Sequence, residues 1–185
     1  MVGLLCLTNK YEIMSSIIKV ELLAENLMSK NFTVKSAGNL YTISAKNLGY
    51  TFKWDNAKRR NGQINYSRKT ISLSKAKAKV NLDKVNTVIK NTILHEIAHS
   101  FSFHIYGMSG RGHCHKWRSI AKQIGCSGDR CTSGYEQPKS KYTLYCTTCK
   151  KKSPMHRSTK ISRSCGVCSP KVYNKKYELK IIQNY

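Results

Sequence analysis

The residues best suited to chemistry stand close together, within residues 92–99. His95, Glu96 and His99 form the pattern H-E-x-x-H inside an apolar run that favours a helix. Residues four apart lie on the same face of a helix, so both imidazoles can bind one tetrahedral Zn²⁺ ion. Glu96 would reach a water molecule activated by the metal, take its proton and return it to a leaving amine. The pattern therefore predicts metal-assisted hydrolysis of an amide bond.

The flanks of this pattern predict that the helix is buried. Apolar side chains surround the three polar ones, namely Ile93, Leu94, Ile97, Ala98 and Phe101. Two histidines and a glutamate in such surroundings are costly unless they bind something. A metal site is therefore favoured over a solvated surface helix.

A catalytic zinc site needs a third protein ligand and one open position. His104 lies five residues after His99, roughly 140° further round the same helix, and so points away. His113 and His115 follow Gly107, which we expect to help end the helix, so the chain can fold back there. The spacing alone leaves both of these histidines open as the third ligand.

Four of the eight cysteines form two C-x-x-C pairs separated by fifteen residues. In an intracellular chain such pairs indicate metal binding and not disulfides. Cys146, Cys149, Cys165 and Cys168 are therefore predicted to hold a structural zinc ion through four thiolates. For Cys114, Cys126 and Cys131 we expect ordinary free thiols.

The composition is strongly basic. The 185 residues include 33 Lys and Arg against 9 Asp and Glu, a net charge of +24. Such a charge favours a polyanionic partner, nucleic acid before an anionic membrane surface. No apolar run approaches the roughly 18–20 residues of a transmembrane helix, and residues 1–7 are too short for a signal-peptide core. We expect an intracellular monomer, in the cytoplasm, nucleoid or nucleus, that is neither secreted nor bound to a membrane.

Hydrophobic periodicity predicts the elements that position these residues. A helix is expected over residues 11–30, followed by a loop or loose hairpin over residues 31–48. Three short strands are expected to form an antiparallel meander, and Asn81 or Asp83 could cap the helix that carries the H-E-x-x-H pattern. The remaining ranges are strands at residues 50–54, 63–66 and 70–74, that helix at about 83–106, a short helix at 117–125, a linker at 134–140 and a strand within 173–182.

The C-terminal part of the chain has the composition of a nucleic-acid binder. Residues 139–185 contain twelve Lys and Arg and a single acid, Glu178, with tyrosines interleaved. Cations that follow phosphates and rings that stack on unpaired bases suit single-stranded, sequence-nonspecific binding. The alternative is a solvated basic surface without a ligand. The residues predicted to bind nucleic acid are Tyr145, Lys150, Lys151, Lys152, Arg157, Lys160 and Arg163.

Residues 112–117, Gly-His-Cys-His-Lys-Trp, bring a resemblance to a known family. They are similar to the motif G-H-G-x-x-[FW] that follows HExxH in the SprT-like zinc metalloproteases, which include the Spartan DNA–protein crosslink proteases. Cys114 departs from the motif, because the family usually has Gly there. The resemblance covers about residues 20–182 and implies that His113, rather than His115, is the third ligand.

With this resemblance, the chain is expected to have an α+β fold in two domains. Residues 11–133 would form a zincin-like metalloprotease domain of helices and a small antiparallel sheet, and residues 140–182 a zinc ribbon. Two zinc ions are expected, one catalytic and one structural. The resemblance implies a DNA-activated endopeptidase that cleaves DNA-bound or DNA-crosslinked proteins, with single-stranded DNA as the partner.

Two alternatives remain open at this point. In the first, the chain is a nucleic-acid-binding zinc-ribbon protein whose protease site is silenced by a Cys114 thiolate approaching the metal. In the second, it is a zinc hydrolase of nucleic acid itself, although the usual pattern of such enzymes lacks the glutamate of HExxH.

Overall fold

The structure is a computed structural model that describes residues 2–131 and 133–185, with side chains described from residue 13 onward. The chain divides into two compact units, Met1–Gln137 and Pro138–Tyr185, called here the N-terminal and C-terminal units. The expectation about a signal-peptide core concerns residues 1–7, whose side chains lie outside the described set. Within the described part, no helix combines the length and apolar character needed to cross a bilayer.

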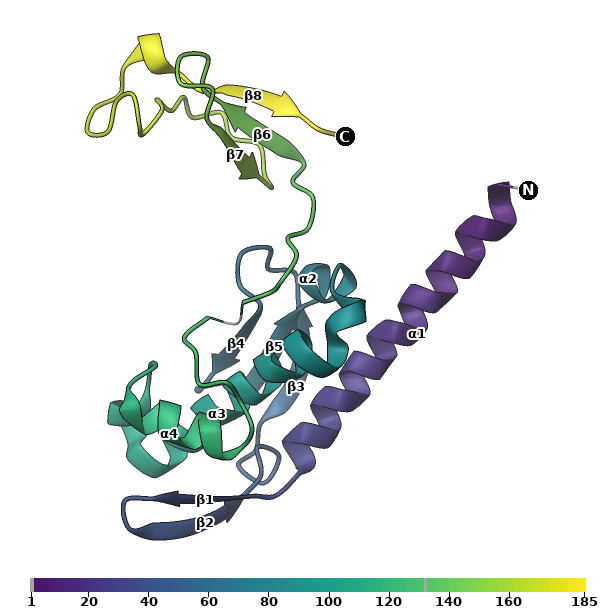
Figure 1. The fold of residues 1–185 in the computed structure, drawn as a ribbon, viewed down its shortest axis with the longest axis vertical. Coiled ribbons are helices and arrows are strands. Elements are labelled where there is room, and N and C mark those ends of the chain that lie inside the picture. Colours follow the sequence, from purple (N-terminus) through teal and green to yellow (C-terminus); the bar gives the residue numbers. More distant parts are fainter. Residues whose placement is uncertain (1, 132) are drawn as a thin grey trace. The chain divides into compact units, whose positions relative to one another are not determined.

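The N-terminal unit mixes helices with two small sheets, which makes it α+β (Figure 1). The predicted loop or hairpin is an antiparallel hairpin in which Phe32 pairs with Ile43 and the chain turns at Ala37 and Gly38. In chain order the elements are α1 (Val2–Ser29), β1 (Phe32–Ser36), β2 (Asn39–Ile43), β3 (Thr51–Asp55), β4 (Gly62–Asn65), β5 (Thr70–Ser74), α2 (Lys75–Lys79), α3 (Lys90–Tyr106) and α4 (His115–Gln123).

The three-stranded sheet has the order β3-β5-β4, so the predicted antiparallel meander is wrong. β5 runs parallel to β3 and antiparallel to β4, and β4 forms one edge. Asp55, at the end of β3, holds the connection by which the chain passes β5 and reaches β4 on the other side of the sheet. Its carboxylate accepts hydrogen bonds from Ser72 of β5 at 2.8 Å and from the backbone N–H of Ala57 at 2.8 Å. These bonds direct the connection past β5, which leaves β5 in the middle of the sheet.

The predicted cap of the long helix has a different role. α3 begins at Lys90, later than predicted, after a 3₁₀ turn (Leu82–Lys84) and a π turn (Val85–Ile89). Asn81 makes no capping bond. Its fully buried amide donates to the carbonyls of Lys77 (2.8 Å) and Glu136 (3.1 Å), and its oxygen accepts from the Glu136 N–H (2.8 Å). Asn81 therefore fixes the last segment of the N-terminal unit against the end of α2.

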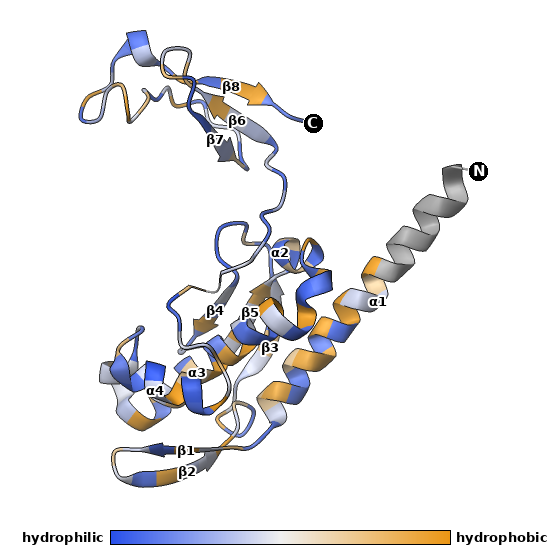
Figure 2. Cartoon of the chain, viewed as in Figure 1, coloured by the Kyte–Doolittle hydropathy of each residue, from blue (hydrophilic) through white to orange (hydrophobic). Residues whose placement is uncertain are grey.

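The core of the N-terminal unit surrounds α3, which is buried from Thr92 to Ser102. α1 covers α3 with a buried face, although Ile13, at the start of its described side chains, is 38% exposed. Figure 2 shows apolar colour recurring along α1, β5 and α3. The side chains that meet there include Val20, Ala24, Met28, Ile71, Leu73, Ile93, Ile97, Phe101, Trp117 and Ile120.

The loop after α3 folds back along the helix because of a close backbone contact. The Ser102 hydroxyl donates to the carbonyl of Gly110 at 2.8 Å. A Cβ atom on Gly110 would lie only 2.1 Å from the carbonyl oxygen of Ser102, so no other residue fits without movement. Gly112 then takes φ +81°, a conformation that favours glycine. These two glycines return the chain to α3 just before His113.

The C-terminal unit is a three-stranded antiparallel sheet with two cysteine-bearing turns. Its strands are β6 (Tyr142–Tyr145), β7 (Lys152–Met155) and β8 (Lys180–Gln183), in the order β7-β6-β8. The strand predicted within residues 173–182 is confined to β8, and a 3₁₀ turn at Lys175–Tyr177 precedes it.

Candidate metal centres and the adjoining cleft

The ring nitrogens of three histidines converge beside α3. His95 and His99 lie on one face of the helix, and the returning loop brings His113 to the same point. The Nε2 atom of His99 lies 3.2 Å from that of His95 and 3.2 Å from that of His113, and the third separation is 2.9 Å. His115 is exposed at the start of α4 and is not part of this cluster.

Trp117 of α4 forms the apolar support of the three imidazoles. Its side chain is fully buried, and its ring centroid lies 4.6 Å from His95, 5.0 Å from His99 and 4.6 Å from His113. The His99 ring stacks on it at an interplanar angle of 25°. Trp117 therefore fixes the orientation of all three rings at once.

The donor set fits a divalent metal of the zinc type. Nitrogens bound at about 2.0–2.1 Å to one tetrahedral Zn²⁺ ion stand about 3.3 Å apart, close to the observed separations. Burial lowers the pKa of His95 to about 4 and of His99 to about 3, and it also lowers the pKa of His113. All three imidazoles are therefore neutral at pH 7, which is the form that binds a metal.

Glu96 is buried on the neighbouring side of α3, against β4. Burial raises the pKa of its carboxyl to about 8, while the charge of Arg60 and the backbone N–H of Ile64 act in the opposite direction. A Cβ atom on Gly62 of β4 would lie 2.9 Å from Oε1 of Glu96. Gly62 thus leaves the space that the carboxyl group needs. A metal cation at the histidines would favour the ionised form of this carboxyl.

The three histidines and Glu96 border a cleft of about 710 Å³ within the N-terminal unit. One wall is the connection to β4 together with β4 itself, residues 59–64. The lining also includes Arg130, Cys131 and residues 133–135, from the segment that follows α4. The segment that Asn81 holds at Glu136 is therefore also part of the cleft lining.

Cys114 lies outside the histidine cluster. Its thiol points toward the carbonyl of Ser109 at 3.7 Å, and it is not among the atoms that gather at His95. Its backbone has φ −70° and ψ 175°, an extended conformation that any residue adopts. A cysteine is therefore tolerated at this position, whereas Gly112 has a positive φ that favours glycine.

The four predicted cysteines gather in the C-terminal unit. All four sulfurs lie within 4.8 Å of one another, with 3.5 Å between Cys149 and Cys165 and 3.9 Å between Cys146 and Cys168. Thiolates around one zinc ion at about 2.3 Å stand about 3.8 Å apart, so the cluster fits such an ion.

Backbone N–H groups in the two turns prepare these thiols for a metal. The N–H groups of Cys168 and Val167 lower the pKa of Cys165 to about 6, and those of Cys149 and Thr148 lower the pKa of Cys146. Burial and the neighbouring sulfurs raise the pKa of Cys168 to about 12. The four groups share protons that a bound cation would displace.

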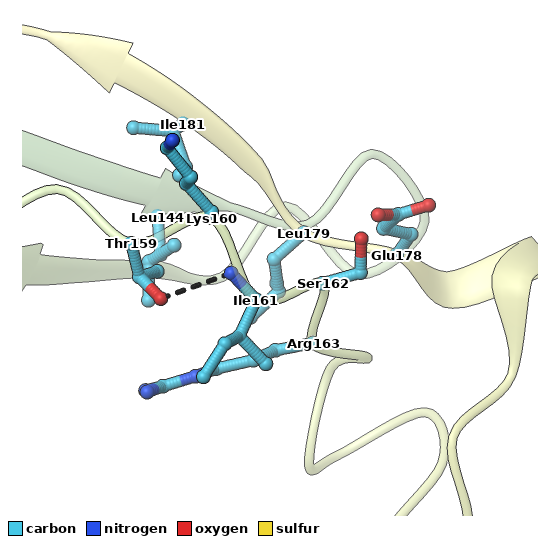
Figure 3. A pocket seen from close by; sticks show the side chains of 9 residues that line it. All are labelled: Leu144, Thr159, Lys160, Ile161, Ser162, Arg163, Glu178, Leu179 and Ile181. Atoms are coloured by element: carbon cyan, nitrogen blue, oxygen red, sulfur yellow. Dashed lines mark hydrogen bonds between the residues drawn. The ribbon is translucent and has the colours of Figure 1, made fainter.

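The predicted nucleic-acid residues do not form one surface. Tyr145 of β6 stands opposite Lys152 of β7, and Lys150 lies 5.9 Å from the Tyr145 ring. Lys160 and Arg163 instead line a hollow of about 210 Å³ with Leu144 and Ile181, as seen in Figure 3. Leu144 and Tyr145 are neighbours on one strand and so point to opposite faces. Lys151 and Arg157 are exposed in the loops on either side of β7.

A sequence model of the SprT-like family matches residues 31–142, more than half of the chain. The chain belongs to the SprT-like family. The match includes the H-E-x-x-H helix and the returning loop with His113, and it ends before the four cysteines. No curated protein and no solved structure gave a significant match. Family membership favours a metalloprotease-like role for this SprT-like chain.

Several residues of the site escaped the sequence analysis. Lys77 is 3% exposed and bonds to the Arg59 carbonyl (3.1 Å) and to Asn61 Oδ1 (2.8 Å). Lys180 of β8 pairs with Tyr145 across the sheet. Nothing in the sequence around Arg130 indicates that this residue lines the cleft. Trp117 could have been found only through its position in the family motif.

The ligand assignment predicts different effects for two neighbouring histidines. His113→Ala should lower the zinc content of the purified SprT-like chain by one ion per molecule, leaving the cysteine-bound ion in place. His115→Ala should leave both ions bound. Elemental analysis against protein concentration measures this, and the reverse pattern would show that His115 is the third ligand.

The raised pKa of Glu96 predicts a pH-dependent difference in stability of the metal-free protein. The folded state disfavours the ionised carboxylate, so this group destabilises the fold as the pH rises from about 4.5 to about 8. Glu96→Gln removes the effect. The melting temperature of Glu96→Gln minus that of wild type should therefore increase across this range.

The three histidines act in the opposite direction, since their lowered pKa values cost stability as the pH falls below about 6.5. Both proteins contain them, so their contribution largely cancels in the difference. A difference that stays constant from pH 4.5 to 8 would contradict the assigned environment of Glu96.

Proposed function

We propose that this SprT-like chain is a zinc-dependent endopeptidase with a zincin-like N-terminal domain and a C-terminal zinc ribbon. Its substrates would be proteins bound or crosslinked to DNA. The observation that carries the proposal is the convergence of three neutral imidazoles beside a buried carboxyl group in an open cleft. His95, His99 and His113 would hold the catalytic ion, and the four cysteines the structural one.

Zinc at the three histidines would supply an acidified water and a polarised peptide carbonyl. Glu96 would take the proton of the attacking water and deliver it to the leaving amine. Trp117 would keep the imidazoles in place while charge develops at the reacting carbonyl.

An extended substrate would lie along β4. This strand is an edge of its sheet, and residues 62–64 line the cleft beside Glu96. Backbone groups on the outer side of an edge strand can pair with an added strand, and such pairing depends little on side chains. Cleavage would therefore tolerate many sequences at the bond that is broken.

The main alternative is a zinc-ribbon protein whose protease site Cys114 has silenced. It requires the thiol at the histidine cluster, and the contact between Cys114 and the Ser109 carbonyl argues against that position. The open cleft at Glu96 also supports an active site.

Single-stranded DNA would bind the face of the C-terminal sheet that carries Tyr145. Lys152 and Lys180 are the cross-strand partners of Tyr145, so the three side chains share that face and form a row. A base could stack on the ring while the lysines contact phosphates on either side. DNA bound there would concentrate substrate and enzyme on the same strand, which is how it would activate cleavage.

Replacement of the proposed base tests the endopeptidase function. Glu96→Gln should keep both zinc ions and the fold but lower kcat by about 10²–10⁴, because the attacking water loses its proton acceptor. The assay measures cleavage of a DNA-binding protein, with and without single-stranded DNA. Asp83→Asn, at an exposed acid outside the cleft, is the matched control and should behave as wild type. Wild-type turnover in Glu96→Gln would remove Glu96 from the mechanism.

The row on the C-terminal sheet predicts a defined change in salt dependence. Lys152→Gln with Lys180→Gln should reduce the slope of log affinity against log salt for single-stranded DNA by about 1.4, because each phosphate contact contributes about 0.7. Lys171→Gln with Lys175→Gln removes the same charge from exposed positions outside the strands. If both pairs change the slope equally, the binding surface is diffuse and the row has no special role.

A further inference from the structure

The side chains that line the cleft at the histidines carry more positive than negative charge. Four cationic side chains line it, Arg59, Arg60, Lys77 and Arg130, and Glu96 is the single acid among the described lining residues. The potential of the cleft is therefore strongly positive apart from any metal it holds.

Two of these cations are already engaged. Arg60 forms an ion pair with Asp55 at 3.0 Å. Lys77 is buried between the Arg59 carbonyl and the Asn61 side chain, and burial lowers its pKa. Both therefore organise the connection that leads into β4.

Among the described lining residues, Arg59 and Arg130 are the two cations without such contacts. Each is exposed, and neither forms an ion pair with any residue that the structure describes. Arg59 precedes β4 on one wall. Arg130 lines the same cleft from the segment that follows α4. The two free guanidinium groups thus come from two segments of the chain that line the same cleft.

We infer that the cleft selects peptide segments that carry carboxylate side chains next to the bond to be cleaved, with Arg59 and Arg130 as the residues that recognise them. Guanidinium groups bind carboxylates through paired hydrogen bonds, and a partly enclosed cleft strengthens that attraction. This inference rests on the proposed endopeptidase function and specifies its substrate class.

The cleft fits a peptide better than a nucleic acid. Residues 62–64 of the edge strand β4 lie along it and can pair with a peptide backbone. Single-strand binders stack bases on exposed rings. Apart from the three imidazoles that would hold the metal, the cleft has one aromatic side chain among its described lining, Tyr135, which is partly buried and lies 5.9 Å from the Lys77 ammonium.

The basic C-terminal unit of the chain would itself be a poor substrate for a cleft that selects carboxylates. Residues 139–185 carry twelve cations and one acid, so the C-terminal unit is a poor match for the cleft. A protein held on DNA by its own cations, in contrast, presents its acidic segments away from the DNA. The enzyme would therefore cut such proteins while sparing its own basic unit.

Matched peptides test the inference with the full zinc-loaded chain. Three peptides differ only at the residues flanking the scissile bond, which are Glu, Gln or Lys. We expect kcat/KM to fall in that order, by about 3–10-fold per step, since each exposed ion pair contributes modestly. Raising the salt concentration should reduce the differences. Equal rates, or a preference for Lys, would overturn the inference.

Charge-matched variants locate the selectivity. Arg59→Gln with Arg130→Gln should remove most of the preference for Glu over Gln. Lys58→Gln with Arg68→Gln removes the same charge from exposed residues that do not line the cleft, and should keep the preference. If both pairs lose it equally, the overall charge of the chain causes the preference and the two arginines do not recognise carboxylates.

A binding measurement separates this inference from the proposed function. Zinc-loaded Glu96→Gln should bind the fluorescent Glu peptide more tightly than the Gln or Lys peptide, whether or not wild type cleaves any of them. If this binding order is retained but wild type cleaves none of the peptides, the proposed endopeptidase function is contradicted and the inference about the cleft is not. If Arg59→Gln with Arg130→Gln weakens binding of single-stranded DNA but not of the Glu peptide, the cleft is a nucleic-acid groove and the inference is wrong.

Discussion

The packing of three imidazoles on one buried indole organises the N-terminal unit. Trp117 is fully buried and touches His95, His99 and His113, so the helix that carries two of them and the loop that carries the third must meet at its ring. The backbone contact between Ser102 and Gly110 makes that meeting possible, because it turns the loop back along α3. Neutral imidazoles cost less to bury beside an apolar ring than charged ones, whose burial would cost several kcal/mol more. The same burial that stabilises α3 therefore keeps the histidines in the form that binds metal.

The sheet contributes to the site through its topology. Because β5 lies in the middle, β4 becomes the edge strand next to Glu96, and its first residue is a glycine that leaves room for the carboxyl group. Asp55 holds the crossing connection in place, and Lys77 supports the same connection from α2. One wall of the cleft is thus fixed by polar contacts of residues that take no part in the chemistry.

The sequence predicted the local features well and the long-range ones poorly. The H-E-x-x-H spacing on a helix and the two C-x-x-C pairs each depend on residues near one another in the chain, and the structure brings both groups together. The parallel pairing of β3 and β5 depends on where the connection passes, which alternating side chains do not encode. The roles of Asn81 and Lys77 also escaped, because each bonds to backbone or side-chain groups more than fifteen residues away. His113 and His115 could not be separated by spacing, since the choice depends on how Gly110 and Gly112 turn the chain.

The open edge of β4 has a consequence for the behaviour of the chain in concentrated solution. An unpaired edge strand can pair with the same strand of another copy, which is a common route to aggregation. Here that edge lies beside Arg59 and Arg60, and each copy carries a net charge of +24. Edge-to-edge pairing would bring these like charges together, so electrostatic repulsion protects the strand without a bulge or a proline. Salt or a polyanion that screens the charge would weaken this protection, which places colloidal stability and substrate access under the control of the same residues.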